Sequence, residues 1–322
     1  MASKRGASIL ILRTITFIFL IISIVILTTD SIDLGDTKGT FKDVHAYRYV
    51  LSVAVIGCAY TLLQLPFATY YAFEEKHMIR DDLLLGFFHF ADLVAALLFA
   101  TGVGAGFGLT VEAKIYLGKD FKELDDFLDK ILISTGFLLG ATITLAIIVL
   151  LKKRERLLRL ILVVNKMASK KTWGITVLLL WLLTFASLVA SIIIIATDNV
   201  DFGGGAKLHF KDIYAYRYIL SVAVIGATYA LIQILFASYY VQNGNHLVRD
   251  DQAVLLLHFA DLVIALLLAT GVGVGYGFTV EQKRFSGDGN NEIDKFLDKA
   301  LISTSFILLA TLCLGALILI KK

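Results

Sequence analysis

Long runs of apolar residues alternate with short polar connections along the whole chain. Each run is long enough to cross roughly 30 Å of hydrocarbon as a helix. The eight predicted spans lie near residues 7–28, 49–72, 83–111, 131–151, 173–196, 218–241, 253–280 and 300–320. This pattern predicts an all-α membrane protein with eight transmembrane helices.

The composition agrees with that assignment. Of the 322 residues, 58% are hydrophobic and one is proline, which leaves too little polar surface for a water-soluble globule of this size. The first run begins just after Lys4 and Arg5 and is too long for the apolar core of a cleaved signal peptide, so we expect it to remain as a helix. The net charge is only +3, and nothing in the chain suggests a nucleic-acid partner.

The connection between the fourth and fifth runs sets the predicted orientation. Its basic residues are Lys152, Lys153, Arg154, Arg156, Arg159, Lys166, Lys170 and Lys171, against one acid. Short loops rich in Lys and Arg stay in the cytoplasm, and an even number of spans places both termini there too. Within this connection, "RERLLRLILVV" forms either an amphipathic helix on the anionic inner leaflet or a solvated charged hinge.

The chain is one unit written twice. "FKDVHAYRYVLSVAVIG" from Phe41 returns as "FKDIYAYRYILSVAVIG" from Phe210, and "FLDKILIST" from Phe127 returns as "FLDKALIST" from Phe296. Each copy has an even number of crossings, so the two have parallel topology and form two tandem four-helix bundles. The predicted parts are a first four-helix module at 1–151, a basic linker at 152–172 and a second module at 173–322.

Two opposite charges lie at matching depth in the first copy. Asp92 is about nine residues, or roughly 13 Å, into the third span from the cytoplasmic end, and Arg13 is about six residues, or roughly 9 Å, into the first. A lone charge there costs about 2.5 to 3.5 kcal/mol on insertion scales. We therefore expect an intramembrane charge pair that selects which helices touch.

A role in transport is the alternative to a structural role for these buried charges. His89 and Asp92 are spaced i, i+3 on one helix face, as in a proton relay. Further protonatable or polar groups at intermediate depth are limited to Tyr60 and Gln64. A secondary transporter or channel, with an ion or proton path near Asp92 and Asp261, is the alternative to a structural pair.

The second copy keeps the acid and loses the base. Asp261 and its neighbour His258 repeat Asp92 and His89, but Trp181 stands at the position equivalent to Arg13. Asp261 is then neutral, or bonds His258, or takes a cation from another helix or another protomer. The sequence leaves these three alternatives open.

Small residues and interfacial groups recur as well. Glycines four apart let membrane helices approach closely, within a bundle or between protomers, and the predicted packing residues are Gly102, Gly104, Gly106, Gly108, Gly271, Gly273, Gly275 and Gly277. Arg48 and Arg217, in the repeated "AYRY" motif at the outer edge of the second helix of each copy, are predicted interfacial anchors.

Motifs for catalysis are missing. The chain has no HExxH, no GxSxG, no P-loop and no His or Cys cluster with metal-ligand spacing. We expect no catalytic residues, no metal and no cofactor, and the protein is not predicted to be an enzyme.

The residues that carry these features resemble a known family. An arginine in the first helix, an aspartate in the third within "FADLVAALLFATGVG", and the segment "AYRYVLSVAVIGCAYTLLQ" resemble the Casparian strip membrane protein and CASP-like family of plants, relatives of the MARVEL four-helix proteins. The resemblance covers each copy nearly end to end. The family arginine maps to Arg13, and the family aspartate maps to Asp92 and Asp261.

The resemblance implies a plasma-membrane scaffold that associates with itself or with related CASP-like proteins and organises a membrane domain. In the founding members, such a scaffold guides local cell-wall modification, so cell-wall enzymes are possible partners together with membrane lipids. Most relatives have one four-helix unit where this chain has two. The outer loop "DSIDLGDTKGTFKDVHAYRY" lacks the Phe-rich signature of strip-forming members, which favours a CASP-like role over Casparian strip formation.

Overall fold

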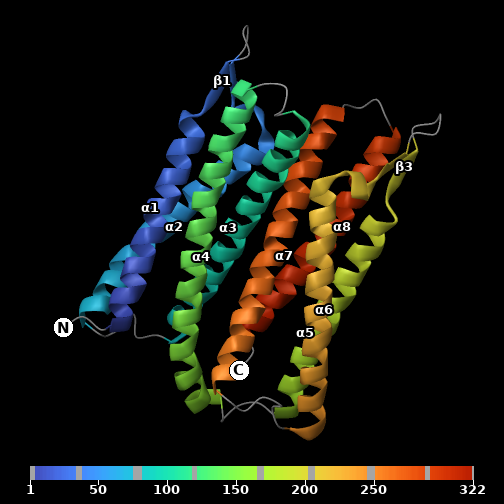
Figure 1. Ribbon diagram of the computed structural model, residues 1–322. Helices are drawn as coiled ribbons and strands as arrows, with labels where there is room; N and C mark the ends of the chain where they lie inside the picture. Colours follow the sequence, from blue (N-terminus) through green and yellow to red (C-terminus); the bar gives the residue numbers. More distant parts are fainter. Residues whose placement is uncertain are drawn as a thin grey trace. The chain divides into compact units, whose positions relative to one another are not determined.

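The computed structural model consists almost entirely of long helices (Figure 1). The structure describes residues 4–33, 38–74, 82–117, 122–164, 170–201, 207–244, 251–286 and 291–320. The helices are α1 (Lys4–Thr29), α2 (His45–Glu74), α3 (Asp82–Tyr116), α4 (Lys122–Val164), α5 (Lys170–Ala196), α6 (Tyr214–Asn243), α7 (Asp251–Ser286) and α8 (Asn291–Ile320). They form because lipid offers the backbone no hydrogen bonds, so an apolar segment must satisfy its own.

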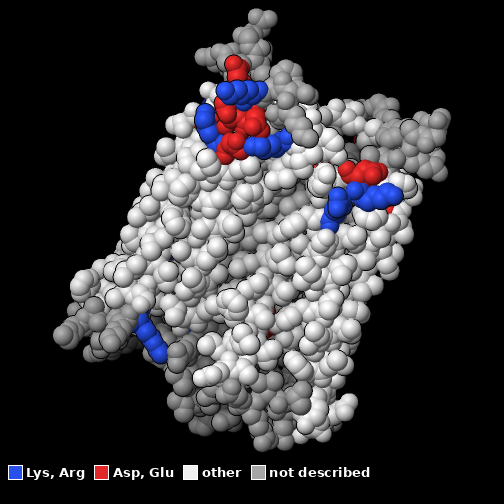
Figure 2. Space-filling view, viewed as in Figure 1, with Lys and Arg blue, Asp and Glu red and all other residues white. Residues whose placement is uncertain are grey.

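All eight of these helices are long and apolar enough to cross a membrane. On the face shown in Figure 2, charged side chains gather near β1 (Ser31–Asp33) and near β3 (Asn199–Asp201), while the surface along the helices is nearly free of them. The prediction of an all-α membrane protein with eight spanning helices is confirmed.

Two short hairpins add a feature that the sequence analysis did not predict. After α1, β1 (Ser31–Asp33) pairs with β2 (Lys38–Thr40) in antiparallel register, and a 3-10 turn, η1 (Phe41–Asp43), leads into α2. The second copy repeats this arrangement with the elements β3 (Asn199–Asp201), β4 (Lys207–His209) and η2 (Phe210–Asp212). Each hairpin therefore joins the first and second helices of its copy.

Helix α4 is longer than its apolar run. It has 43 residues and continues without a break to Val164, so the segment "RERLLRLILVV" from Arg154 is the continuation of α4. The segment is therefore helical, while its predicted position on the inner leaflet stays a prediction, and its side chains lie outside the described residues. Residues 165–169 of the basic linker lie outside the described part as well.

The chain divides into two compact units. Unit 1 contains residues 1–151 and 273–287, and unit 2 contains residues 152–272 and 288–322. In unit 1, α1 packs against α2 and α2 against α3; in unit 2, α5 packs against both α6 and α8. Through these contacts the first helix of each copy lies beside the helix that carries a partly buried tyrosine, Tyr60 on α2 or Tyr229 on α6.

Candidate intramembrane polar site

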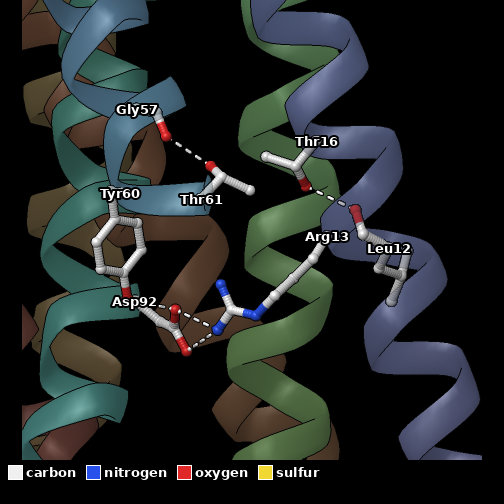
Figure 3. Close-up of polar contacts among 7 residues, drawn as sticks. All are labelled: Leu12, Arg13, Thr16, Gly57, Tyr60, Thr61 and Asp92. Atoms are coloured by element: carbon white, nitrogen blue, oxygen red, sulfur yellow. Dashed lines mark hydrogen bonds and ion pairs between the residues drawn. The ribbon is translucent and has the colours of Figure 1, made fainter. Parts of the chain in front are cut away.

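Arg13 and Asp92 meet inside unit 1. The Nη2 atom of Arg13, on α1, donates hydrogen bonds of 2.8 Å and 3.0 Å to the two carboxylate oxygens of Asp92, on α3 (Figure 3). The side chains are 1% and 0% exposed. A charged hydrogen bond in so dry a setting is stronger than in water, and loss of either partner leaves the other charge buried and uncompensated.

A third helix contributes to the same site. The hydroxyl of Tyr60, on α2, donates a 2.6 Å hydrogen bond to Oδ1 of Asp92. Figure 3 shows Tyr60 and Arg13 reaching the carboxylate from α2 and α1. The Asp92 carboxylate thus joins α1, α2 and α3.

Threonines beside this cluster donate hydrogen bonds to backbone carbonyls of their own helices. Thr16 donates to the carbonyl of Leu12 at 2.8 Å and Thr61 donates to the carbonyl of Gly57 at 2.5 Å (Figure 3). Thr16 also lies 2.7 Å from Thr144 on α4, hydroxyl to hydroxyl. Such hydroxyl contacts bind helices together without adding a charge to the bilayer.

Unit 2 builds a different site around the equivalent acid. Asp261 is fully buried and accepts a 2.6 Å hydrogen bond from Tyr229, whose hydroxyl accepts one of 2.8 Å from Nε2 of Gln233. Trp181 is buried and meets the Tyr229 ring edge-on at 5.8 Å between centroids. The structure therefore gives Asp261 a partner, Tyr229, that none of the three sequence alternatives named.

The two histidines beside these acids are also buried. His89 lies one turn before Asp92 on α3, and His258 lies one turn before Asp261 on α7. Gln64, considered above as part of a relay, is buried on α2. A relay role for these groups stays a prediction.

The glycines lie where helices approach closely. In unit 1, a Cβ added to Gly106 would lie 2.5 Å from the Thr135 hydroxyl, and one added to Gly273 would overlap the carbonyl oxygen of Thr101. Neighbours also surround the positions of Gly102, Gly108, Gly271 and Gly277 at 2.9 to 3.1 Å, and Gly104 and Gly275 are buried. These contacts occur within single units; glycine packing between protomers stays a prediction.

The predicted anchors lie at the start of α2 and α6. Arg48 and Arg217 are both exposed. The Arg217 guanidinium stacks over the ring of Tyr214 at 5.1 Å. Exposure at a helix end suits an interfacial residue, and the anchoring role itself stays a prediction.

Buried acids at the ends of α1 and α5 were missed by the sequence analysis. Asp30 is buried and lies 2.9 Å from Nζ of Lys130, on α4. Its counterpart Asp198 lies 3.3 Å from Nζ of Lys299, on α8. The signal was available, because both lysines stand in the repeated FLDK motif and both acids follow a repeated threonine.

Burial changes the proton affinity of these two acids. Desolvation raises the pKa of Asp30, and the nearby Lys130 ammonium and Ser31 amide offset part of that rise. Desolvation also raises the pKa of Asp198 to about 6, with Lys299 and the amide of Asn199 opposing it. The charged form is disfavoured because water is excluded from the carboxylate.

Serine pairs reinforce the contact between the first and fourth helices. The Ser134 hydroxyl donates to the Ser23 carbonyl at 2.8 Å, and Ser303 donates to the Ser191 carbonyl at 3.0 Å. The two hydroxyls of each pair lie 3.1 Å and 2.8 Å apart. The repeated "FLDK" and "ST" segments are thus the face of α4, and of α8, that contacts the preceding first helix.

Comparison with known proteins gives a consistent result for both copies. The family described as Casparian strip membrane protein domain matches residues 3–144 and again residues 170–313. CASP-like protein 4D1 of Ricinus communis is 39% identical over 144 residues, covering 44% of this chain and 84% of that protein. CASP-like protein 4D2 of Arabidopsis thaliana is 38% identical over 151 residues, covering 44% and 85%. No solved structure matches the chain.

Proposed function

The chain belongs to the Casparian strip membrane protein domain family, with its domain in tandem duplicate, and from this we propose that it is a non-catalytic scaffold of the plasma membrane. It self-associates, or associates with related CASP-like proteins, and organises a membrane domain. Its N-terminus, central linker and C-terminus lie in the cytoplasm, and its two hairpins face the other side.

One observation carries this proposal. Arg13, Asp92 and Tyr60 contact one another across three helices, with the ion pair buried from solvent. Charges arranged in this way fasten helices, because opening the contact would expose each of them to lipid. A rigid bundle of this kind is suited to lateral packing.

The orientation rests on charge asymmetry. The basic residues are concentrated in the connection after the fourth span, and the C-terminal pair Lys321–Lys322 lies on the same side after an even number of crossings. Lys and Arg near membrane segments favour the cytoplasmic side. The same residues would attract anionic lipids of the inner leaflet.

The partners follow from the surfaces that remain. The apolar helix faces contact membrane lipids and, in the assembly, neighbouring copies or relatives. The short hairpins and the connections between the third and fourth helices of each copy are the parts available to components outside the cell, cell-wall enzymes among them. In the described part of the chain no observation favours the secondary transporter or channel, and both Asp92 and Asp261 are 0% exposed.

The test is the behaviour of a fluorescent fusion in plant cells. We expect immobile patches in the plasma membrane that recover slowly after photobleaching. Arg13→Ala and Asp92→Ala should disperse them, because each leaves one buried charge without its partner. Ile11→Ala, at a lipid-facing position of α1 that is 59% exposed, is the matched control and should leave the patches unchanged. Uniform, freely diffusing fluorescence of the wild type would overturn the proposal.

A further inference from the structure

The contact between Asp198 and Lys299 differs from its counterpart in unit 1. Asp198 follows the end of α5 and immediately precedes β3, and its side chain is 1% exposed. Among the described residues, Lys299 is the charged side chain that contacts Asp198. The 3.3 Å contact lacks hydrogen-bond geometry, so both carboxylate oxygens are buried without a hydrogen bond from the described residues.

Unit 1 satisfies the equivalent carboxylate better. There Lys130 donates a 2.9 Å hydrogen bond to Oδ1 of Asp30, and only Oδ2 remains without one from the described part of the chain. A buried carboxylate that lacks hydrogen bonds is costly when ionised. The cost is removed when the group takes up a proton, because the neutral acid needs far less solvation.

We propose that Asp198 is a proton-binding site that makes the docking of the β3–β4 hairpin onto unit 2 dependent on pH. In its neutral form the carboxyl stays buried at little cost and Lys299, whose side chain is 51% exposed, extends into water. In its ionised form the carboxylate is stabilised only in part, by Lys299 and the amide of Asn199, and the segment that leads into β3 opens more often.

The sign of the effect follows from the direction of the pKa shift. The pKa of Asp198 is raised from 3.8 to about 6 in the folded protein, so the folded state binds the proton more tightly than the unfolded chain does. The stabilisation by this proton is fully present below about pH 4 and is lost as the pH rises through about 6. The hairpin of unit 2 is therefore held more firmly in acid than at neutral pH.

The other charged groups described on α8 and η2 are more exposed than Asp198. On α8, Lys295 lies one turn before Lys299 and pairs with Glu292 at 2.8 Å, and Asp298 is exposed. On the 3-10 turn η2, Lys211 and Asp212 are exposed. On β4, His209 lies opposite Asn199 in the strand register and is partly exposed. Among the described residues at the junction of α5 with β3, Asp198 is thus the buried titratable group, and Asp198→Asn separates its effect from that of His209.

The experiment uses the full chain in lipid nanodiscs between about pH 4 and about pH 8. Infrared difference spectra should show a protonated carboxyl band with a midpoint near pH 6 that is absent in Asp198→Asn. Hydrogen exchange of peptides carrying β3 and β4, corrected for the intrinsic effect of pH, should slow below that midpoint. In Asp198→Asn it should be slow throughout, because the amide mimics the neutral acid.

Two further variants test whether Asp198 causes the pH-dependent transition. Asp30→Asn, the matched change in unit 1, should leave the transition of β3 and β4 in place. Lys299→Gln removes the opposing cation and should move the midpoint upward, which also serves if Asp198→Asn fails to fold. A midpoint near the ordinary carboxyl value, an unmoved midpoint in Lys299→Gln, or the same transition in Asp198→Asn would each overturn the proposal.

Discussion

The two copies keep the same tyrosine–aspartate bond and differ in what lies opposite it. Tyr60 and Tyr229 each donate a 2.6 Å hydrogen bond to the acid of their own copy. Arg13 completes the first site, whereas buried Trp181 stands at its position in the second. The tyrosine is thus the constant partner of the acid, and the arginine is specific to the first copy.

A second difference concerns size and not charge. In unit 1 the ring of Phe19 covers Gly140, where an added Cβ would lie 2.8 Å from it. The equivalent residues of the second copy are Ser187 and Leu309. A large residue on the first helix with a small one on the fourth has been replaced by the reverse arrangement, with similar total side-chain volume.

The largest expected effect on stability is the difference between substitutions of Asp92 and Asp261. Asp92→Asn leaves the Arg13 guanidinium buried without its counter-charge and should lower the free energy of unfolding by about 3 kcal/mol or more. Asp261→Asn keeps an oxygen for Tyr229 and removes no arginine partner, so the loss should be about 1 kcal/mol. Unfolding of both purified variants in detergent measures this. Equal losses would contradict the distinction between the copies.

The next largest effect is expected from changing side-chain size at the contact between Phe19 and Gly140. Gly140→Leu drives a side chain into Phe19 and should cost about 2 kcal/mol. The double variant Phe19→Ser/Gly140→Leu, which copies the second unit, should recover at least half of that loss. A double-mutant cycle on unfolding free energies gives the coupling, and strictly additive losses would show that the two positions are independent.

Loss of the shared hydrogen bond should have a smaller effect, and the loss should be somewhat larger in the second copy because Gln233 also donates to the Tyr229 hydroxyl. Tyr60→Phe and Tyr229→Phe each remove one hydroxyl within a membrane bundle, at a cost of about 1 kcal/mol. The measurement is the same unfolding assay. Tyr49→Phe provides the control, since its hydroxyl bonds Thr101 at a partly exposed position. A loss confined to Tyr60→Phe would tie the tyrosine to the arginine.

The smallest effect is expected at an exposed pair. Lys295 and Glu292 lie 2.8 Å apart with side chains 65% and 58% exposed. Lys295→Ala should change the unfolding free energy by less than about 0.5 kcal/mol because water and salt screen the pair. A larger change would mean that this end of α8 is buried in the assembled protein.

Depth explains why the sequence located the main site. A membrane helix rises by 1.5 Å per residue across a hydrocarbon layer of nearly fixed thickness, so the levels of Arg13 and Asp92 follow from counting. The duplication then pointed to Asp261 and Trp181. Tyr60 was underrated, because a tyrosine within a span does not reveal whether its hydroxyl meets an acid until the helix faces are known.

Other features lie beyond what counting can give. Strands of three residues, such as β1 and β3, are too short to show the alternation that predicts a strand. Asp30 and Asp198 stand at helix ends, where a carboxylate is usually solvated. Their burial depends on how Lys130 and Lys299 on another helix cover them, and that depends on the fold.

The hairpins allow the loops between the first and second helices to change in length without any change in the membrane-spanning helices. Equivalent residues are 168 apart up to Asp198 and 169 apart from Phe41 onward, since four residues separate Asp33 from Lys38 and five separate Asp201 from Lys207. The extra residue lies between the two strands, and the antiparallel pairs keep the same register in both copies. Recognition at these tips is therefore open to evolutionary change while the lipid-embedded framework stays the same.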